Sequence, residues 1–272
     1  PIDRTLNSDG MDKAFELVSG YFKHGKVYSY PPTYKRMTWR VPERYKVHCA
    51  YISKYNHSLK NVLPISYSTS FMKDVSAKEL FPHLHSHPIG IPWIFKYYER
   101  DWGFRLPYSM HKAMSADESY FVNIQSEYTN DPLHVYWTTS THPNNGRRML
   151  IMAHLDHPYQ ANDGISGVAV GIEVMKRLER NPLPEGSRRV DLLITPETIG
   201  SVCYFSDEWH RQADGAVFID FAGSDGDVML QTSRKGWQDI DFIAHEFIKD
   251  TDVDHWKWFR TDYGNDEAIS DG

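Results

Sequence analysis

Residues 150–178 place four potential metal ligands at the point where an apolar run ends. The segment reads LIMAHLDHPYQANDGISGVAVGIEVMKRL and contains His154, Asp156, His157 and Asp163. A strand-to-helix junction needs only a turn, so the turn alone does not explain these two histidines and two aspartates. Histidine nitrogen and carboxylate oxygen together suit zinc, which in catalytic sites keeps one position open for water. The segment therefore predicts a metal site.

Two further carboxylates follow two other apolar runs. Glu197 lies in ITPETIGS and Asp220 lies in VFIDFAG. Taken alone, each candidate has an ordinary structural interpretation: His154 as a buried histidine, Asp163 as a turn residue or helix cap, Glu197 as a residue that starts a helix, and Asp220 as a turn at a strand end. If all of them share one sheet edge, however, like charges raise one another's pKa unless a cation is bound. Their common position favours the metal.

The expected chemistry is hydrolysis of an amide bond. Zinc lowers the pKa of bound water, and a nearby carboxylate can pass the proton to a leaving group. Glu197 is our candidate for this proton transfer. We expect one or two Zn²⁺ ions, since two ions about 4 Å apart can share a bridging carboxylate.

Three other features could indicate a functional site, but we interpret them as structural. His83, His85 and His87 alternate in FPHLHSHP, but the flanking prolines indicate an irregular loop. Ser166 lacks the G-x-S-x-G context of a nucleophile, and Cys203 has no evident base beside it. We expect all of them to be structural.

The elements that must position the ligands can be read from the hydrophobic pattern. Apolar runs at 147–156, 188–195 and 215–223 predict buried strands, and 165–180 and 237–250 predict helices. Their alternation predicts an α/β fold: a mixed sheet with helices on both faces, binding ligands beyond its strand ends. Each helix has an expected inward side: Ile165, Ala169, Ile172 and Met175 on the first, and Ile240, Ile243, Phe247 and Ile248 on the second.

The N-terminal part of the chain has a different pattern of apolar and polar residues. A helix begins after Ser8 or Asp9, with Met11, Phe15 and Val18 at helical spacing. Short alternating runs with frequent turns then indicate a small β-rich unit.

Composition excludes some classes of function. The chain has 272 residues, a net charge of −6 and no basic run, which argues against nucleic-acid binding. No apolar stretch reaches the roughly 20 residues of a membrane span. The two cysteines form no disulfide framework, which favours the cytoplasm. A peptide or small amide is the expected partner, and an oligomer is possible.

The segment AHLDHPYQANDGISGVA resembles the first metal motif of the zinc aminopeptidase superfamily, which includes leucyl aminopeptidases, glutamate carboxypeptidase and glutaminyl cyclases. The resemblance implies a zinc-exopeptidase fold, of the phosphorylase/hydrolase-like type. It implies that His154 and Asp220 bind one zinc and that Asp163 bridges. Asp156 would orient the site, and Asp266 in YGNDEAI resembles a later motif near the pocket.

A closer resemblance covers most of the chain. The segments TWRVPERYKVHCAYI, SYSTSFMKDVSAKELFPHLHSHP, IPWIFKYYERDWGF and TPETIGS are similar to a bacterial family described as aminopeptidase-like. That family often accompanies polysaccharide or natural-product genes. The resemblance implies a peptidase-like α/β domain formed by 1–36 and 116–272, with a β-rich domain at 37–115 inserted into it.

The chain departs from the superfamily pattern in three respects. Only Glu197 stands where the superfamily has two adjacent glutamates, so it is either base or ligand. His157 competes with His154 as a ligand. The last histidine ligand is expected beyond residue 272, because His245 and His255 precede the later motif. Two alternatives therefore stay open: a catalytically degenerate scaffold or binding protein, and a zinc amidase acting on a non-peptide substrate.

Overall fold

The computed structural model divides the chain into two compact units. One comprises Pro1–Val41 and Pro132–Gly272, and the other comprises Pro42–Asp131. The residues that the structure describes are 2–55, 57–140, 147–206, 213–233 and 235–249, together with the backbone of 256–259.

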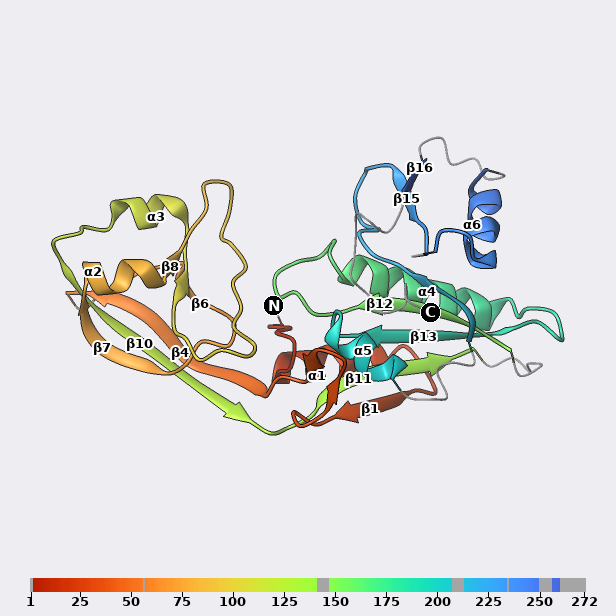
Figure 1. The fold of residues 1–272 in the computed structure, drawn as a ribbon, viewed down its shortest axis with the longest axis horizontal. Helices are drawn as coiled ribbons and strands as arrows, with labels where there is room; N and C mark the ends of the chain where they lie inside the picture. The colour runs from red at the N-terminus through yellow and green to blue at the C-terminus, as the bar shows by residue number, and fades with distance from the viewer. Residues whose placement is uncertain are drawn as a thin grey trace. The chain divides into compact units, whose positions relative to one another are not determined.

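The first unit is built on a mixed five-stranded sheet with the order β1-β11-β13-β12-β14 (Figure 1). β12 pairs in parallel with both β13 and β14, whereas β11 pairs antiparallel with β1 and β13. The predicted buried strands are confirmed. The bounds are β1 (Lys26–Tyr30), β11 (Leu133–Thr139), β12 (Arg148–His154), β13 (Arg189–Thr195) and β14 (Ala213–Phe218).

Helices cover both faces of this sheet, as predicted. α1 (Asp9–Ser19) and α4 (Ile165–Arg180) share one core with Ala153 and Leu192 of the strands. α5 (Ile199–Phe205) lies on the opposite face, where its Tyr204 lines a small cavity with Leu150 and Asp191.

Local signals in the sequence set the ends of α1. Ser8 is its N-cap and accepts a hydrogen bond from the backbone N–H of Met11 at 3.2 Å. Met11, Phe15 and Val18 are buried on its inner face. This helix therefore forms and packs as its spacing predicts.

The inward face of α4 differs from the expected one only at Ala169, since Met175 is buried and Ile165 and Ile172 pack against the same core. Ala169 is exposed, whereas Gly167, Val168, Gly171 and Met175 are buried. A Cβ atom on Gly167 would lie 2.0 Å from the carbonyl oxygen of Ile219. The glycine side of the helix faces inward because it lets the helix backbone approach the chain after β14 closely.

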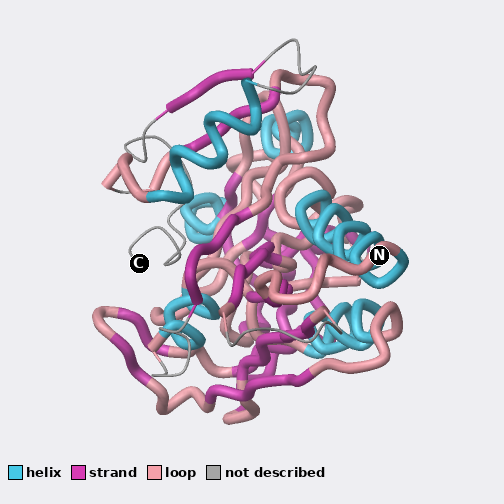
Figure 2. Tube along the Cα trace, turned by 90° about the vertical axis from the view of Figure 1, so that its right-hand side faces the viewer, coloured by secondary structure: helices cyan, strands magenta, loops and turns pink. Residues whose placement is uncertain are grey.

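The C-terminal strands are not part of the central sheet. β15 (Val228–Gln231) pairs in parallel with β16 (Trp256–Phe259), and α6 (Asp239–Lys249) lies beside this pair (Figures 1 and 2). The expected inward positions Ile243 and Phe247 are wrong, since their side chains are 64% and 69% exposed.

Asp241 accounts for this orientation of α6. Its carboxylate is buried and accepts bonds from the N–H groups of Ser233 and Gln238. The polar side of the helix start therefore turns inward.

The second unit contains a four-stranded antiparallel sheet, β5-β4-β10-β7, and a three-stranded sheet, β6-β9-β8. Ile52, Val75, Phe104 and Val122 belong to its separate core. The bounds are β4 (Arg44–Lys54), β5 (His57–Ser58), β6 (Leu63–Pro64), β7 (Phe71–Ser76), α2 (Ala77–Leu80), a 3₁₀ turn (Phe81–His83), β8 (Leu84–His85), β9 (Phe104–Arg105), α3 (Tyr108–Ala113) and β10 (Ser119–Thr129).

The boundaries of this unit differ from the expected 37–115. β10 pairs with β4 and β7, so residues 116–131 belong with the β-rich unit. At the other end, β2 (Lys35–Arg36) and β3 (Trp39–Arg40) form a ribbon in the first unit. The boundary implied by the resemblance does not include these pairings, because the partner strands lie far apart in sequence.

Two points complete the description. Among the described residues, no helix combines the length and the apolar character needed to cross a membrane. The segment Asn144-Asn145-Gly146, whose residue types predict a tight turn, lies outside the described residues.

Candidate metal centre

The topology brings three strand ends to one edge of the sheet. β12 lies between β13 and β14 and runs parallel to both, so the chain leaves all three at the same edge. His154 ends β12, Glu197 follows β13 and Asp220 follows β14. The structure thus brings together residues that are up to 66 positions apart (220 − 154) in the sequence.

Three carboxylates lie around the ring of His154. Its Nε2 atom lies 3.2 Å from Asp163 Oδ1 and 3.2 Å from Asp220 Oδ2. On its other side, Nδ1 lies 3.6 Å from Asp156 Oδ1. The ring is fully buried, and neither nitrogen has a hydrogen-bond partner of acceptable geometry among the described residues. Buried polar atoms left in this state are destabilising, and a bound cation would satisfy them.

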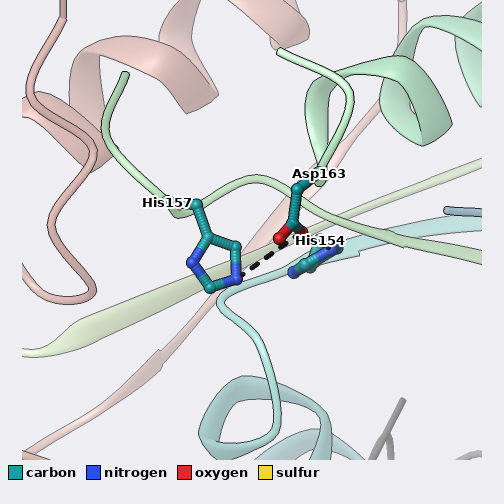
Figure 3. A group of neighbouring side chains, drawn as sticks. All are labelled: His154, His157 and Asp163. Atoms are coloured by element: carbon teal, nitrogen blue, oxygen red, sulfur yellow. Dashed lines mark ion pairs between the residues drawn. The ribbon is translucent and has the colours of Figure 1, made fainter. Parts of the chain in front are cut away.

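His157 approaches the same aspartate from another side (Figure 3). Its Nε2 atom lies 3.7 Å from Asp163 Oδ1 and 2.8 Å from Glu197 Oε2. Donor atoms of His154, His157 and Asp163 all lie within 4.8 Å of one another. Those of Asp156, His157 and Glu197 form a second group of this kind. Both histidines therefore remain candidate ligands around Asp163.

Backbone N–H groups orient two of the carboxylates. Oδ1 of Asp220 accepts hydrogen bonds from the N–H groups of Gly164 at 3.0 Å and Phe221 at 2.8 Å. Its other oxygen is left to face His154. Oδ1 of Asp156 accepts a bond of 2.8 Å from the N–H of Glu197. Each carboxylate thus has one oxygen fixed by the loop that follows a neighbouring strand or begins α4.

Asn162 and Ser166 fasten the loop after Asp220 to the start of α4. The N–H of Ala222 donates to Ser166 Oγ at 2.9 Å, and the N–H of Gly223 donates to Asn162 Oδ1 at 2.7 Å. This supports the structural interpretation of Ser166. The role of Asn162 was not predicted, although it stands in the same Asn-Asp-x-x-Ser-Gly motif that pointed to Asp163.

The loops that carry the ligands hold unusual backbone conformations. His157, Tyr159, Thr198 and Phe221 all have φ between 50° and 70°. Residues with a side chain enter this left-handed region rarely, at a free-energy cost of order 1–3 kcal/mol each, and such residues cluster at functional sites. Four of the eight non-glycine residues with positive φ that the structure describes therefore lie within two residues of a candidate ligand, which supports a functional role for these loops.

The electrostatics of the cluster favour a cation. Burial alone would lower the pKa of His154, but the carboxylates of Asp156 and Asp220 raise it to about 11. Burial raises the pKa of Asp163. Burial also opposes ionisation of Asp220, yet contact with His154 lowers its pKa overall. These carboxylates therefore favour a positive charge at His154, which a bound metal ion would also supply.

The donors present fit zinc. An imidazole nitrogen and two carboxylate oxygens meet at one point, and the imidazole is fully buried without a hydrogen-bond partner among described residues. The remaining nitrogen of His154 faces Asp156, the arrangement by which a carboxylate orients a ligating histidine.

Other sequence candidates lie elsewhere. The described residues contain no metal-ligand group that includes His83, His85 or His87. Cys203 is buried in α5, and His245 of α6 contacts Glu246. Asp266 and His255 lie outside the described residues, so their predicted relation to the site stays a prediction.

Several solved structures with a similar fold are described as peptidases. A structure described as a peptidase from Clostridium acetobutylicum has a TM-score of 0.86 at 23% identity and covers 98% of this chain and 64% of its own. The zinc aminopeptidase of Bacillus subtilis has a TM-score of 0.69 at 12% identity, with coverage of 95% and 76%. A peptidase M28 precursor from Shewanella amazonensis reaches 0.63 at 12% identity, with coverage of 99% and 78%. The resemblance to zinc aminopeptidases is confirmed at the level of the fold.

Sequence comparison gives a relative and a family. A Clostridium acetobutylicum protein, named for polysaccharide biosynthesis and an aminopeptidase-like domain, is 24% identical over 278 residues. The alignment includes 98% of this chain, which spans 63% of that relative's length. A family model described as a domain of unknown function (DUF4910) matches residues 1–270, and the chain belongs to this family.

Proposed function

We propose that the protein is a zinc-dependent hydrolase that cleaves an amide bond in the manner of an aminopeptidase. One observation carries this proposal: the buried Nε2 atom of His154 lies 3.2 Å from both Asp163 and Asp220 and has no hydrogen-bond partner among the described residues. These residues come from two strand ends and the start of a helix. Their convergence is difficult to stabilise without a cation.

His154, Asp163 and Asp220 would hold one zinc ion. His157 is the alternate ligand, or it serves a second ion that shares Asp163. When bound, zinc supplies a Lewis acid for the carbonyl oxygen and lowers the pKa of water. Asp156 would hold the ring of His154 in the ligating orientation through Nδ1.

Glu197 would move the proton. Its side chain is 32% exposed, so water and substrate can reach it, and its Oε2 atom contacts His157 Nε2 at 2.8 Å. In hydrolysis, a water oxygen bonds to the carbonyl carbon and the C–N bond breaks. Glu197 would accept the proton from water and deliver it to the departing nitrogen.

A second candidate function has its own support. The Clostridium relative is named for polysaccharide biosynthesis, and this chain spans 63% of that relative's length. A zinc amidase that acts on an acylated amino sugar or on another non-peptide amide would use the same donors. A non-catalytic scaffold is the third possibility, since only one glutamate follows β13 at this position.

Metal analysis and a substrate panel test these alternatives. We expect the wild-type protein to hold stoichiometric zinc and the Asp163→Ala variant to hold none. Hydrolysis of aminoacyl amides would support the aminopeptidase, and hydrolysis of N-acyl amino sugars alone would support the amidase. Zinc without hydrolysis of either class would favour the scaffold. A wild type without zinc would contradict all catalytic versions. A cytoplasmic location and oligomerisation stay predictions.

A further inference from the structure

Arg4 makes contacts that no sequence pattern predicted. Its side chain is buried, with 8% of the residue exposed. Nε donates a hydrogen bond of 2.8 Å to the carbonyl oxygen of Leu155, and Nη2 donates to the carbonyls of His157 at 2.9 Å and Gln160 at 2.8 Å. A buried guanidinium is destabilising unless it is well paired, so the burial of Arg4 needs a structural explanation.

The three carbonyls belong to the loop that carries Asp156 and His157. Within this loop, His157 and Tyr159 have φ values of 66° and 70°. Among the described residues, Arg4 is the only hydrogen-bond donor to the carbonyls of Leu155 and Gln160. A single planar side chain therefore spans both ends of the strained segment and fixes its path.

The segment that carries Arg4 is itself held firmly. Ser8, the cap of α1, donates through Oγ to the carbonyl of Thr5 at 2.7 Å, and Thr5 Oγ1 donates to Asp3 Oδ1 at 2.8 Å. A Cβ atom on Gly10 would lie 1.6 Å from the carbonyl oxygen of Asp3, so only glycine permits this crossing. Arg4 is thus anchored through α1 to the core of the first unit.

The charge of Arg4 also suits its surroundings. Burial lowers the pKa of Arg4, while the nearby carboxylate of Asp156 opposes that shift. The guanidinium remains charged, since arginine is not deprotonated in proteins. Arg4 therefore places one positive charge near a cluster of side chains that is rich in carboxylates.

We propose that Arg4 is a positioning residue for the metal centre: it holds the 155–160 backbone so that Asp156 and His157 face the donors on the neighbouring strand ends. The inference rests on the proposed function, because it assigns Arg4 a role toward the same zinc site. Lysine could preserve the charge, but it lacks the planar fork that bonds three carbonyls at once.

The test compares Arg4→Lys and Arg4→Ala with Arg148→Lys in the full-length protein. Arg148 is also 8% exposed and lies at the opposite end of β12, where it contacts Asp191. We measure zinc affinity by competition with a chelator, and amide hydrogen exchange of 155–160 in the metal-free protein. Both Arg4 variants should bind zinc about 10- to 100-fold more weakly, as expected when a group that orients ligands is lost. They should exchange faster in 155–160, and Arg148→Lys should change neither quantity.

The outcomes separate this inference from the proposed function. Arg4 variants with wild-type zinc affinity, or with unchanged exchange in 155–160, would overturn the inference while zinc binding by the wild type still stood. An equal loss of affinity in Arg148→Lys would also overturn it, because the effect would then be general destabilisation. A wild type that binds no zinc would overturn the proposed function, and this inference with it.

Discussion

Each unit of the molecule contains a group of histidines, and the two groups are built differently. In the first unit, His154 and His157 face aspartates and a glutamate, and the ring of His154 is fully buried. In the second unit, His83 stacks on Trp102 at 3.8 Å between ring centroids and bonds to the carbonyl of Trp102 at 2.8 Å. Its neighbour His85 has a pKa that burial lowers.

The difference shows which feature marks a metal site. FPHLHSHP carries three histidines within five residues, more imidazole than the peptidase motif does. The His83 ring nevertheless stacks on Trp102, His87 is exposed, and the carboxylate near this group is Asp101, 3.6 Å from His83 Nδ1. The first unit instead combines imidazole with several carboxylates in a buried place, where a cation relieves the repulsion. The candidate centre is identified by imidazole and carboxylate groups that lie close together in a buried place, rather than by the number of histidines.

The largest expected effect is the loss of zinc when Asp163 is replaced. Asp163 faces both His154 and His157, so Asp163→Asn should weaken zinc binding more than about 100-fold, beyond the loss seen for groups that only orient ligands. His85→Ala in the second unit should leave zinc content unchanged. Isothermal titration with zinc measures both. The reverse pattern would move the metal site to the second unit.

The next effect concerns catalysis. If Glu197 transfers the proton, Glu197→Gln should reduce kcat about 100- to 10,000-fold and leave zinc affinity nearly unchanged. If it is instead a ligand, zinc affinity should fall together with kcat. Steady-state kinetics on the substrate that the panel identifies, with zinc titration of the same variant, distinguish these roles.

Zinc binding in the first unit should depend on pH through His154. In the metal-free protein the pKa of His154 is about 11, so zinc must displace its proton near neutral pH. Zinc affinity should therefore rise about tenfold per pH unit between pH 7 and 9, as linkage with one proton requires. Calorimetry in buffers of different ionisation enthalpy should show that proton being released. Affinity independent of pH would contradict the proposed role of His154.

The same shift has a consequence for metal-free stability. The folded pKa of His154 is raised above its ordinary value of 6.5, so its stabilising contribution is complete below about pH 6.5 and is lost as pH rises toward 11. Urea unfolding of the metal-free protein should show stability falling over this range. The pKa of His85 is lowered by burial, so NMR titration should place its transition below pH 6.5.

The smallest expected effect lies in the second unit. His83→Ala removes a stacked ring and one hydrogen bond, and should lower the free energy of unfolding by about 1 kcal/mol without changing zinc affinity. His87 is exposed, so His87→Ala serves as the control and should be nearly neutral. Urea denaturation measures both. A loss of zinc in either variant would contradict a purely structural role.

Much of the site could be predicted because local patterns determine it. Apolar runs fixed β12, β13 and β14, and the residues directly after them are the donors that converge. The parallel order of these strands follows from the helices between them, and it places their carboxyl ends together. Ser8 and the apolar spacing after it determined where α1 begins and what it buries.

Only the tertiary structure decided features that depend on distant segments. The boundary of the β-rich unit moved to 42–131 because β10 pairs with β4, more than 60 residues earlier in the chain. The buried side of α4 was set by the close approach of Gly167 to Ile219, and that of α6 by the capping role of Asp241.

Arg4 is the clearest case of this division. It binds a loop about 150 residues away, and nothing in its own neighbourhood of the sequence indicates that. The sequence by itself determined which residues offer nitrogen and oxygen donors, since residue type and strand ends are local properties. The fold decided that Asp156 Oδ1 both accepts the N–H of Glu197 and faces His154, whereas Asp220 accepts backbone N–H groups through Oδ1 and faces His154 through Oδ2. Hydrogen-bond geometry between segments depends on packing, and packing is established only when the whole unit is folded.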